Sequence, residues 1–169
     1  MALGANVLGL ITSQAAVKKV LCTVDADQVS DVQKKALEAA LKANYSNHLS
    51  VTERLSILWC ELPPAQGFTN YAQPCVSLVV IEAQDGLDQQ RREAMLGDCA
   101  ADWARVTGIP LERLMISVFD ATEFALYMQA NQRRLSAWGR LRFGLHMLRS
   151  LLLSKARRGV LAFHPNLGA

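Results

Sequence analysis

PCVSLVVIEAQDGLDQQRREAMLGDCAADWARVTGIPLERLMISVFD, residues 74–120, is the stretch that decides the fold of this 169-residue chain. It opens with an apolar run, which predicts a strand, and the polar turn 84–86 leads into a predicted helix over about 87–106. The segment 107–110 contains glycine and proline and interrupts the chain before a second predicted strand at 114–119. A strand, a helix and a strand in this order predict a βαβ unit with two adjacent parallel strands.

The preceding segment, residues 16–61, shows the same order of elements. Its strand, helix and strand are expected at 16–24, 31–44 and 54–61. Ser30 and Gln33 have the spacing of a capping box, which predicts that the helix begins directly after Ser30. Residues 44–50 are polar and predict a loop.

The two βαβ segments also resemble each other in sequence. Glu-Arg-Leu-x-Ile occurs at 53–57 and again at 112–116, and a glutamine followed by two basic residues occurs at 33–35 and 90–92. Because these matches come in the same order, we interpret them as a tandem duplication. The expected fold is α/β, a four-stranded sheet with both helices on one face. The other face is apolar and uncovered by this segment, which predicts oligomerisation.

Composition limits the functional classes. Hydrophobic residues make up 51% of the chain and charged residues 20%, as in a soluble globular protein. Four cysteines without CxxC spacing predict buried free thiols in a reducing, cytoplasmic compartment: Cys22, Cys60, Cys75 and Cys99. We expect no secretory signal, no membrane span, no metal and no cofactor, since the chain lacks the matching segments and motifs.

Charge is distributed unevenly along the chain. Residues 1–132 contain ten Lys or Arg and fifteen Asp or Glu, a net charge of −5, whereas residues 133–169 contain eight basic residues and no acid, a net charge of +8. An acidic body with a basic tail indicates separate units. We therefore divide the chain into an N-terminal extension at 1–15, a repeat domain at 16–124 and a basic helical C-terminal extension at 125–169.

Three motifs of the repeat domain resemble the tautomerase superfamily, with patterns similar to those of macrophage migration inhibitory factor and 4-oxalocrotonate tautomerase. They are the strand start Pro74–Leu78, the helix start Leu87–Arg91 and the segment Gly108–Ile116 that runs into Phe119 and Asp120. The resemblance covers roughly residues 16–124. It implies a homotrimer whose sheets face inward around a central barrel, with three pockets between subunits.

The family's chemistry depends on an amino-terminal proline that acts as a base in keto–enol tautomerisation. A desolvated pocket keeps that secondary amine neutral near pH 7. In this chain residue 2 is Ala2, and the position of the family's proline falls near Val17. Pro74 begins the second repeat at the equivalent place, but its nitrogen lies in a peptide bond. We therefore expect that the proline mechanism does not operate here.

Other site positions of the family are carried over one by one. Its carboxylate-binding arginine falls near Ala26 and Asp27, where no arginine stands. Lys18 and Lys19 lie beside the proline position, where a desolvated lysine could act as base or Schiff-base former, or both could be solvated strand-edge charges. The pocket candidates that the resemblance implies are Val17, His48, Ser50, Met115 and Ser117. For His48 the alternative is a plain loop histidine, and for Ser117 a plain strand residue.

The C-terminal extension has its own pattern. Residues 125–132 are expected to connect to a long helix over about 133–158. An apolar stripe recurs at spacings of 3, 4, 3 and 4 and consists of Trp138, Leu141, Leu145, Leu148 and Leu152. Arg142 and Arg149 flank the stripe, and the opposite side carries Arg133, Arg140 and Arg158.

Three partners remain open for this helix. In the first, the stripe packs on its own or a neighbouring subunit, and in the second it lies on an anionic membrane surface. In the third, the arginines contact nucleic acid or another acidic partner, which includes the chain's own body. Two functions also remain open. We favour a non-catalytic binding or scaffold protein. The alternative is a divergent enzyme, a tautomerase, an isomerase or a related activity, that takes a small keto or enol acid, or another carbonyl or aromatic ligand, in an intersubunit pocket.

Overall fold

The computed structural model describes residues 17–49, 53–63, 77–133 and 136–165. Along the chain the elements are β1 (Val17–Asp25), α1 (Asp31–His48), β2 (Arg54–Leu62), β3 (Ser77–Ala83), α2 (Gln89–Thr107), the 3-10 turn η1 (Leu111–Arg113), β4 (Leu114–Asp120), α3 (Ala121–Arg133), α4 (Ala137–Arg158) and β5 (Ala162–Phe163). The N-terminal extension 1–15, Ser50, Pro74 and Cys75 lie outside the described residues.

Both predicted βαβ units are present. β1 pairs with β2 and β3 pairs with β4, each in parallel, and the two units join through an antiparallel pairing of β1 with β3. The sheet has the order β4-β3-β1-β2-β5. Its fifth strand was not expected: β5 adds to the edge of β2, with Ala162 opposite Trp59. The prediction of a tandem α/β repeat is confirmed, and the C-terminal extension contributes the additional strand.

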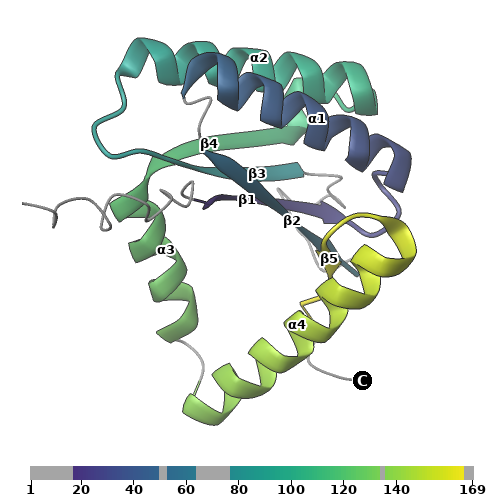
Figure 1. Cartoon of the computed structure of the whole chain (residues 1–169). Coiled ribbons are helices and arrows are strands. Elements are labelled where there is room, and N and C mark those ends of the chain that lie inside the picture. Colours follow the sequence, from purple (N-terminus) through teal and green to yellow (C-terminus); the bar gives the residue numbers. More distant parts are fainter. Residues whose placement is uncertain (1–16, 50–52, 64–76, 134–135, 166–169) are drawn as a thin grey trace, which may run out of the picture.

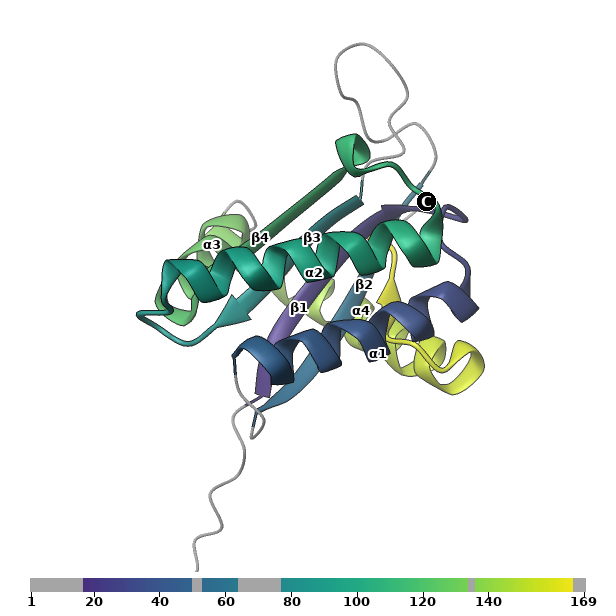
Figure 2. The same ribbon diagram turned by 90° about the horizontal axis from the view of Figure 1, so that it is seen from above.

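The helices α1 and α2 cover one face of the sheet, as expected, and lie side by side across it (Figures 1 and 2). The core between them and the sheet is built from alternate strand residues such as Val20, Cys22 and Val24 of β1, all fully buried. Trp59 of β2 contacts Trp103 of α2, with ring centroids 5.8 Å apart. This alternation follows from the period of two in a strand, which sends every second side chain into the same layer.

Helix α1 begins as predicted but ends later. The Ser30 side chain accepts from the Gln33 backbone N–H, and the Gln33 side chain accepts from the Ser30 backbone N–H, so the capping box is complete. The prediction of a loop from residue 44 was wrong. The Asn44 side chain donates to Asp102 of α2 at 3.0 Å, and the buried Tyr45 hydroxyl donates to Glu53 at 2.8 Å. These tertiary contacts hold the polar end of the helix in place.

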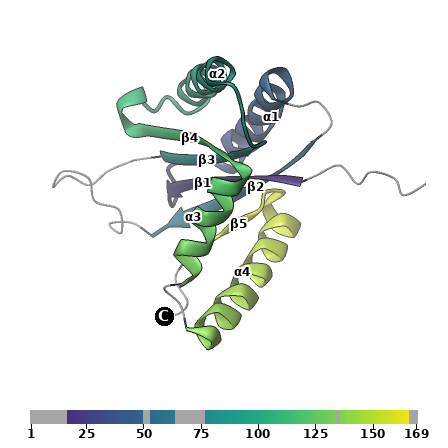
Figure 3. The same ribbon diagram turned by 90° about the vertical axis from the view of Figure 1, so that its left-hand side faces the viewer.

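On the opposite face of the sheet lie α3 and α4 (Figures 1 and 3). α3 contains all of residues 125–132, which were expected to be a simple connection, so that prediction was wrong. It starts directly after β4, where the Asp85 carboxylate accepts from both the backbone N–H and the hydroxyl of Thr122. α4 begins after its N-cap Ser136, slightly later than expected, and ends at Gly159, whose φ of +78° suits glycine.

The described cysteines agree with the predicted thiols. Cys22, Cys60 and Cys99 are free and buried, and burial raises the pKa of the Cys60 and Cys99 thiols to about 11. The thiols of these two residues are therefore protonated at neutral pH. Across the described ranges, no helix is both long enough and apolar enough to cross a membrane. Within the same residues, no three His, Cys, Asp or Glu side chains are grouped as a metal site.

Candidate functional site

Val17, the predicted position of the family's proline, lies at the start of β1, where an ionic cluster surrounds Lys18. The Lys18 side chain is only 11% exposed, and its ammonium lies 3.8 Å from Glu53 Oε1 and 3.9 Å from Glu82 Oε1. It also contacts the backbone oxygen of Ala83 at 3.5 Å. We call Lys18, Tyr45, Glu53 and Glu82 the Lys18 cluster. Strand alternation places Lys18 on the same face of β1 as the core residue Val20.

Each carboxylate of the Lys18 cluster has a second donor. Tyr45 of α1 donates to Glu53, and the backbone N–H of Lys19 donates to Glu82 at 3.0 Å. Burial, followed by the hydrogen bond to Glu53, raises the pKa of the Tyr45 hydroxyl, which therefore remains a neutral donor. Attack on a carbonyl requires a neutral amine, so Lys18 would have to give up both ion pairs first. The side chain of Lys19 is exposed and does not take part.

The remaining predicted pocket residues are not gathered around Val17 within one chain. Val17 is 55% exposed at the start of β1. Met115 lies beside Leu78, which pairs with Thr23 near the other end of β1. At a rise of 3.3 Å per residue, that point is roughly 20 Å along the strand from Val17. Met115 and Ser117 alternate with the buried Val118, so they lie on the sheet face away from α1 and α2.

His48 occupies the last position of α1 instead of a loop. Its Nε2 lies 2.7 Å from Asp98 Oδ2, which links α1 to α2. A histidine in the last turn of a helix also complements the helix dipole, since the carbonyl end is the negative end. The geometry assigns His48 a contact between helices. Its role in a pocket stays a prediction, as does that of Ser50, which lies outside the described residues.

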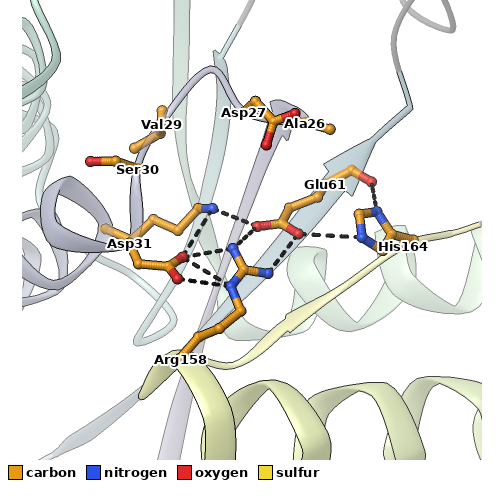
Figure 4. Close-up of a pocket in the computed structure, with 9 residues that line it drawn as sticks. Ala26, Asp27, Val29, Ser30, Asp31, Glu61, Arg158 and His164 are labelled. Atoms are coloured by element: carbon orange, nitrogen blue, oxygen red, sulfur yellow. Dashed lines mark hydrogen bonds and ion pairs between the residues drawn. The ribbon is translucent and has the colours of Figure 1, made fainter.

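At the other end of β1 the structure contains a cavity of about 570 Å³. It lies between the turn after β1, the first turn of α1, the end of β2 and the end of the C-terminal extension (Figure 4). Its lining residues are Ala26, Asp27, Val29, Ser30, Asp31, Lys34, Glu61, Arg158 and His164. We call this cavity the Arg158 pocket. Ala26 and Asp27, near which the family's arginine was predicted to fall, are among its lining residues.

Arg158 reaches this pocket from the last turn of α4. Its Nε lies 2.9 Å from Asp31 Oδ2, and its Nη1 lies 2.9 Å from Glu61 Oε2 (Figure 4). The Lys34 ammonium contacts the other oxygen of Glu61 at 2.5 Å, and a ring nitrogen of His164 lies 2.9 Å from the Glu61 backbone oxygen. Glu61 is thus surrounded by cationic and polar groups from three separate segments.

The charges of the pocket neutralise one another. Burial raises the pKa of the Glu61 carboxyl, but hydrogen bonds from Arg158 and Lys34 outweigh it, so this pKa lies below its usual value. The hydrogen bond from Arg158 also lowers the pKa of Asp31. Both carboxylates are therefore ionised at neutral pH and occupy the donors of the guanidinium. This arrangement anchors α4, and an acidic ligand could take the guanidinium only by replacing one of these carboxylates.

Sequence reasoning missed most of this pocket. Arg158 was singled out only as part of a basic helix, with the chain's acidic body as one possible partner. No site was predicted at Asp31, Lys34, Glu61 or His164, because their contacts join segments that are distant in the chain. The acid at the end of β2, where apolar residues prevail, was the one local signal.

Comparison with protein-family models and with curated proteins finds no match. Comparison with solved structures finds the same fold in several proteins. An asymmetric trimer of a fused 4-OT superposes with a TM-score of 0.55 at 15% identity, over 60% of this chain and 85% of that one. MIF2 of Leishmania major gives a TM-score of 0.53 at 17% identity, over 63% of this chain and 90% of that one.

A third structure is N1, a member of the cis-3-chloroacrylic acid dehalogenase family, with a TM-score of 0.55 at 13% identity, over 60% of this chain and 73% of that one. These neighbours are tautomerase superfamily proteins. The expected tautomerase-like fold is confirmed. At such low identity the likeness concerns the fold alone.

Proposed function

We propose that this chain of tautomerase fold forms a homotrimer and acts as a non-catalytic binding or scaffold protein. The Lys18 cluster carries the proposal. At the position of the family's catalytic amine, the chain places Val17, whose nitrogen belongs to a peptide bond, and Lys18, whose ammonium is held by Glu53 and Glu82. A base needs a free electron pair, and neither an amide nitrogen nor an ion-paired ammonium offers one.

The sheet face away from α1 and α2 supports the homotrimer. Met115 on this face is 59% exposed and Val17 is 55% exposed. Apolar side chains exposed on this face favour association, because their burial removes apolar surface from water. One structure with the same fold is described as an asymmetric trimer of a fused 4-OT. We further propose that the chain works in the reducing cytoplasm, since the three described cysteines are free.

An activity assay tests the non-catalytic role directly. The purified chain is incubated with phenylpyruvate and with 2-hydroxymuconate, and ketonisation is followed by absorbance. We expect no rate above the buffer reaction. A rate that falls in Lys18→Ala but not in Lys19→Ala would overturn the proposal and assign the base to Lys18. Light scattering after gel filtration tests the trimer separately, and a monomeric chain would contradict that part.

The Arg158 pocket favours a second candidate, a divergent enzyme or binding protein for a small keto or enol acid. Arg158 brings a guanidinium to the pocket that Ala26 and Asp27 line, at the place where the sequence lacks the family's arginine. An acid bound there would replace Asp31 or Glu61 as the acceptor. Calorimetric titration with phenylpyruvate tests this candidate. Binding that is lost in Arg158→Lys, with folding retained, supports it, and heat no different from dilution excludes it for this ligand.

A further inference from the structure

Helix α4 packs against its own chain through its less apolar side. Ser154 is buried on this side and donates to the Val160 backbone oxygen at 3.0 Å. Phe143 lies earlier in the helix on the same side. Its ring contacts the ring of Phe163 edge to face, with centroids 6.5 Å apart. His146 is half-buried between these positions. Residues 143, 146, 150 and 154 recur at helical spacing and so define the side that faces the body.

The apolar stripe of α4 points the other way. Its members are more than half exposed: Trp138 74%, Leu141 52%, Leu145 61%, Leu148 55% and Leu152 62%. Most helices in globular proteins do the reverse and bury their apolar stripe. In Figures 1 and 3, α4 lies on the side of the sheet opposite α1 and α2 and slopes away from the sheet. The stripe is therefore exposed and available to a partner.

Charge identifies the kind of partner. Residues 137–158 contain six Lys or Arg and no acid. Arg142 and Arg149 lie along one flank of the stripe, Lys155 lies along the other, and all three are exposed. If two α4 helices packed through this seam, these cations would meet with no acid from either helix to neutralise them. An anionic surface offers an apolar layer for the leucines and negative groups near the basic flanks.

We propose that α4 lies flat on an anionic lipid surface, with the leucine stripe in the boundary between headgroups and acyl chains. Basic side chains on the flanks then extend to lipid phosphates, and Trp138 lies at the headgroup level. A single helix of this size gives weak, reversible binding. The affinity part of this proposal rests on the homotrimer proposed above, since three linked helices bind with avidity.

Vesicle sedimentation tests the proposal with the full chain. Phosphatidylcholine vesicles with and without phosphatidylglycerol are mixed with the protein at low and high salt, and the bound fraction is measured. We expect binding only to vesicles that contain phosphatidylglycerol, with less binding at high salt. Leu148→Glu should lower the affinity for these vesicles roughly tenfold or more, because it places a charge where the lipid would bury a leucine.

Leu126→Glu is the matched control. Leu126 of α3 is 53% exposed and Leu148 of α4 is 55% exposed, so both variants carry the same change at similarly exposed helical positions. Circular dichroism checks the folding of both variants. Equal binding to vesicles without phosphatidylglycerol, no binding at all, or equal losses in both variants would overturn the proposal.

Light scattering without lipid separates this proposal from the homotrimer. If Leu148→Glu dissociates an oligomer that the unchanged chain forms, the stripe is an interface between copies and the lipid proposal fails. If the unchanged chain is monomeric and still binds phosphatidylglycerol vesicles, the lipid surface stands and the homotrimer fails.

Discussion

Arg158 and Glu61 are 97 residues apart in the chain, and Arg158 Nη1 donates to Glu61 Oε2 over 2.9 Å. The Glu61 side chain is only 5% exposed, so its charge depends on nearby cations. Arg158 also contacts Asp31 at the start of α1. This pair of contacts fastens the C-terminal end of α4 to the repeat domain, and it leads to the first two predictions.

Replacing Arg158 by alanine should destabilise the fold by about 2 kcal/mol. The change leaves Glu61 buried with Lys34 as its remaining cation, and removal of one partner from a buried pair is costly. The loss stays below the upper range of such changes because the Arg158 side chain is 33% exposed and Lys34 persists. Urea unfolding measures the difference. Arg157→Ala, an exposed neighbour in the same turn, should change stability little, and an equal loss in both variants would contradict the anchor.

The contribution of this anchor should depend on pH. Arg158 holds the pKa of Asp31 below its usual value, and the pKa of Glu61 is also lowered, since hydrogen bonds from Arg158 and Lys34 outweigh burial. Carboxyl groups with lowered pKa in the folded chain stabilise it above their unfolded values, about pH 4, and lose this effect as pH falls through the folded values. Unfolding at pH 7 and at successively lower pH should show the gap between the unchanged chain and Arg158→Ala narrowing below about pH 4. A gap that widens in acid would argue against the assignment.

Lys18→Met should cost about 2 kcal/mol of stability, because it removes the cation of a largely buried ionic cluster. Methionine keeps the length of the side chain but leaves Glu53 and Glu82 without their shared cation. Thermal unfolding of this variant is compared with that of Lys19→Met, whose exposed side chain makes a matched control. If Lys18→Met is as stable as the control, the Lys18 cluster does not stabilise the start of β1.

Met115→Glu should dissociate the proposed homotrimer. Met115 is exposed on the sheet face away from α1 and α2, where a charge would be buried on association. Light scattering after gel filtration should show a smaller particle than for the unchanged chain. Val32→Glu is the control, because Val32 is 79% exposed on α1, on the other side of the sheet. An intact trimer in Met115→Glu would place the interface elsewhere.

Local patterns were sufficient for the repeat domain. Short apolar segments predicted β1 and β2, and the spacing of Ser30 and Gln33 predicted the start of α1 correctly. These signals depend on neighbours within a few residues, where side-chain period and capping act directly. The repeated Glu-Arg-Leu-x-Ile motif then indicated two units, which the pairing of β1 with β3 joins into one sheet.

Long-range contacts could not be predicted in the same way. The end of α1 depends on Asn44 meeting Asp102 of α2, and β5 exists because Ala162 pairs with Trp59. Neither partner is visible in a short sequence window. The same reason explains why the sequence placed Lys18 in a possible pocket but not between Glu53 and Glu82, which come from two other segments.

The antiparallel pairing of β1 with β3 has an evolutionary consequence. It relates the two halves of the chain by an approximate twofold rotation, so the starts of β1 and β3 lie at opposite ends of the sheet. If two identical chains of one βαβ unit each paired in this way, every substitution would appear at both ends of the sheet. Here the two halves are encoded separately, so the start of β1, with Lys18, and the start of β3 can carry different residues. Separate encoding thus allows a substitution at one end of the sheet without the same substitution at the other.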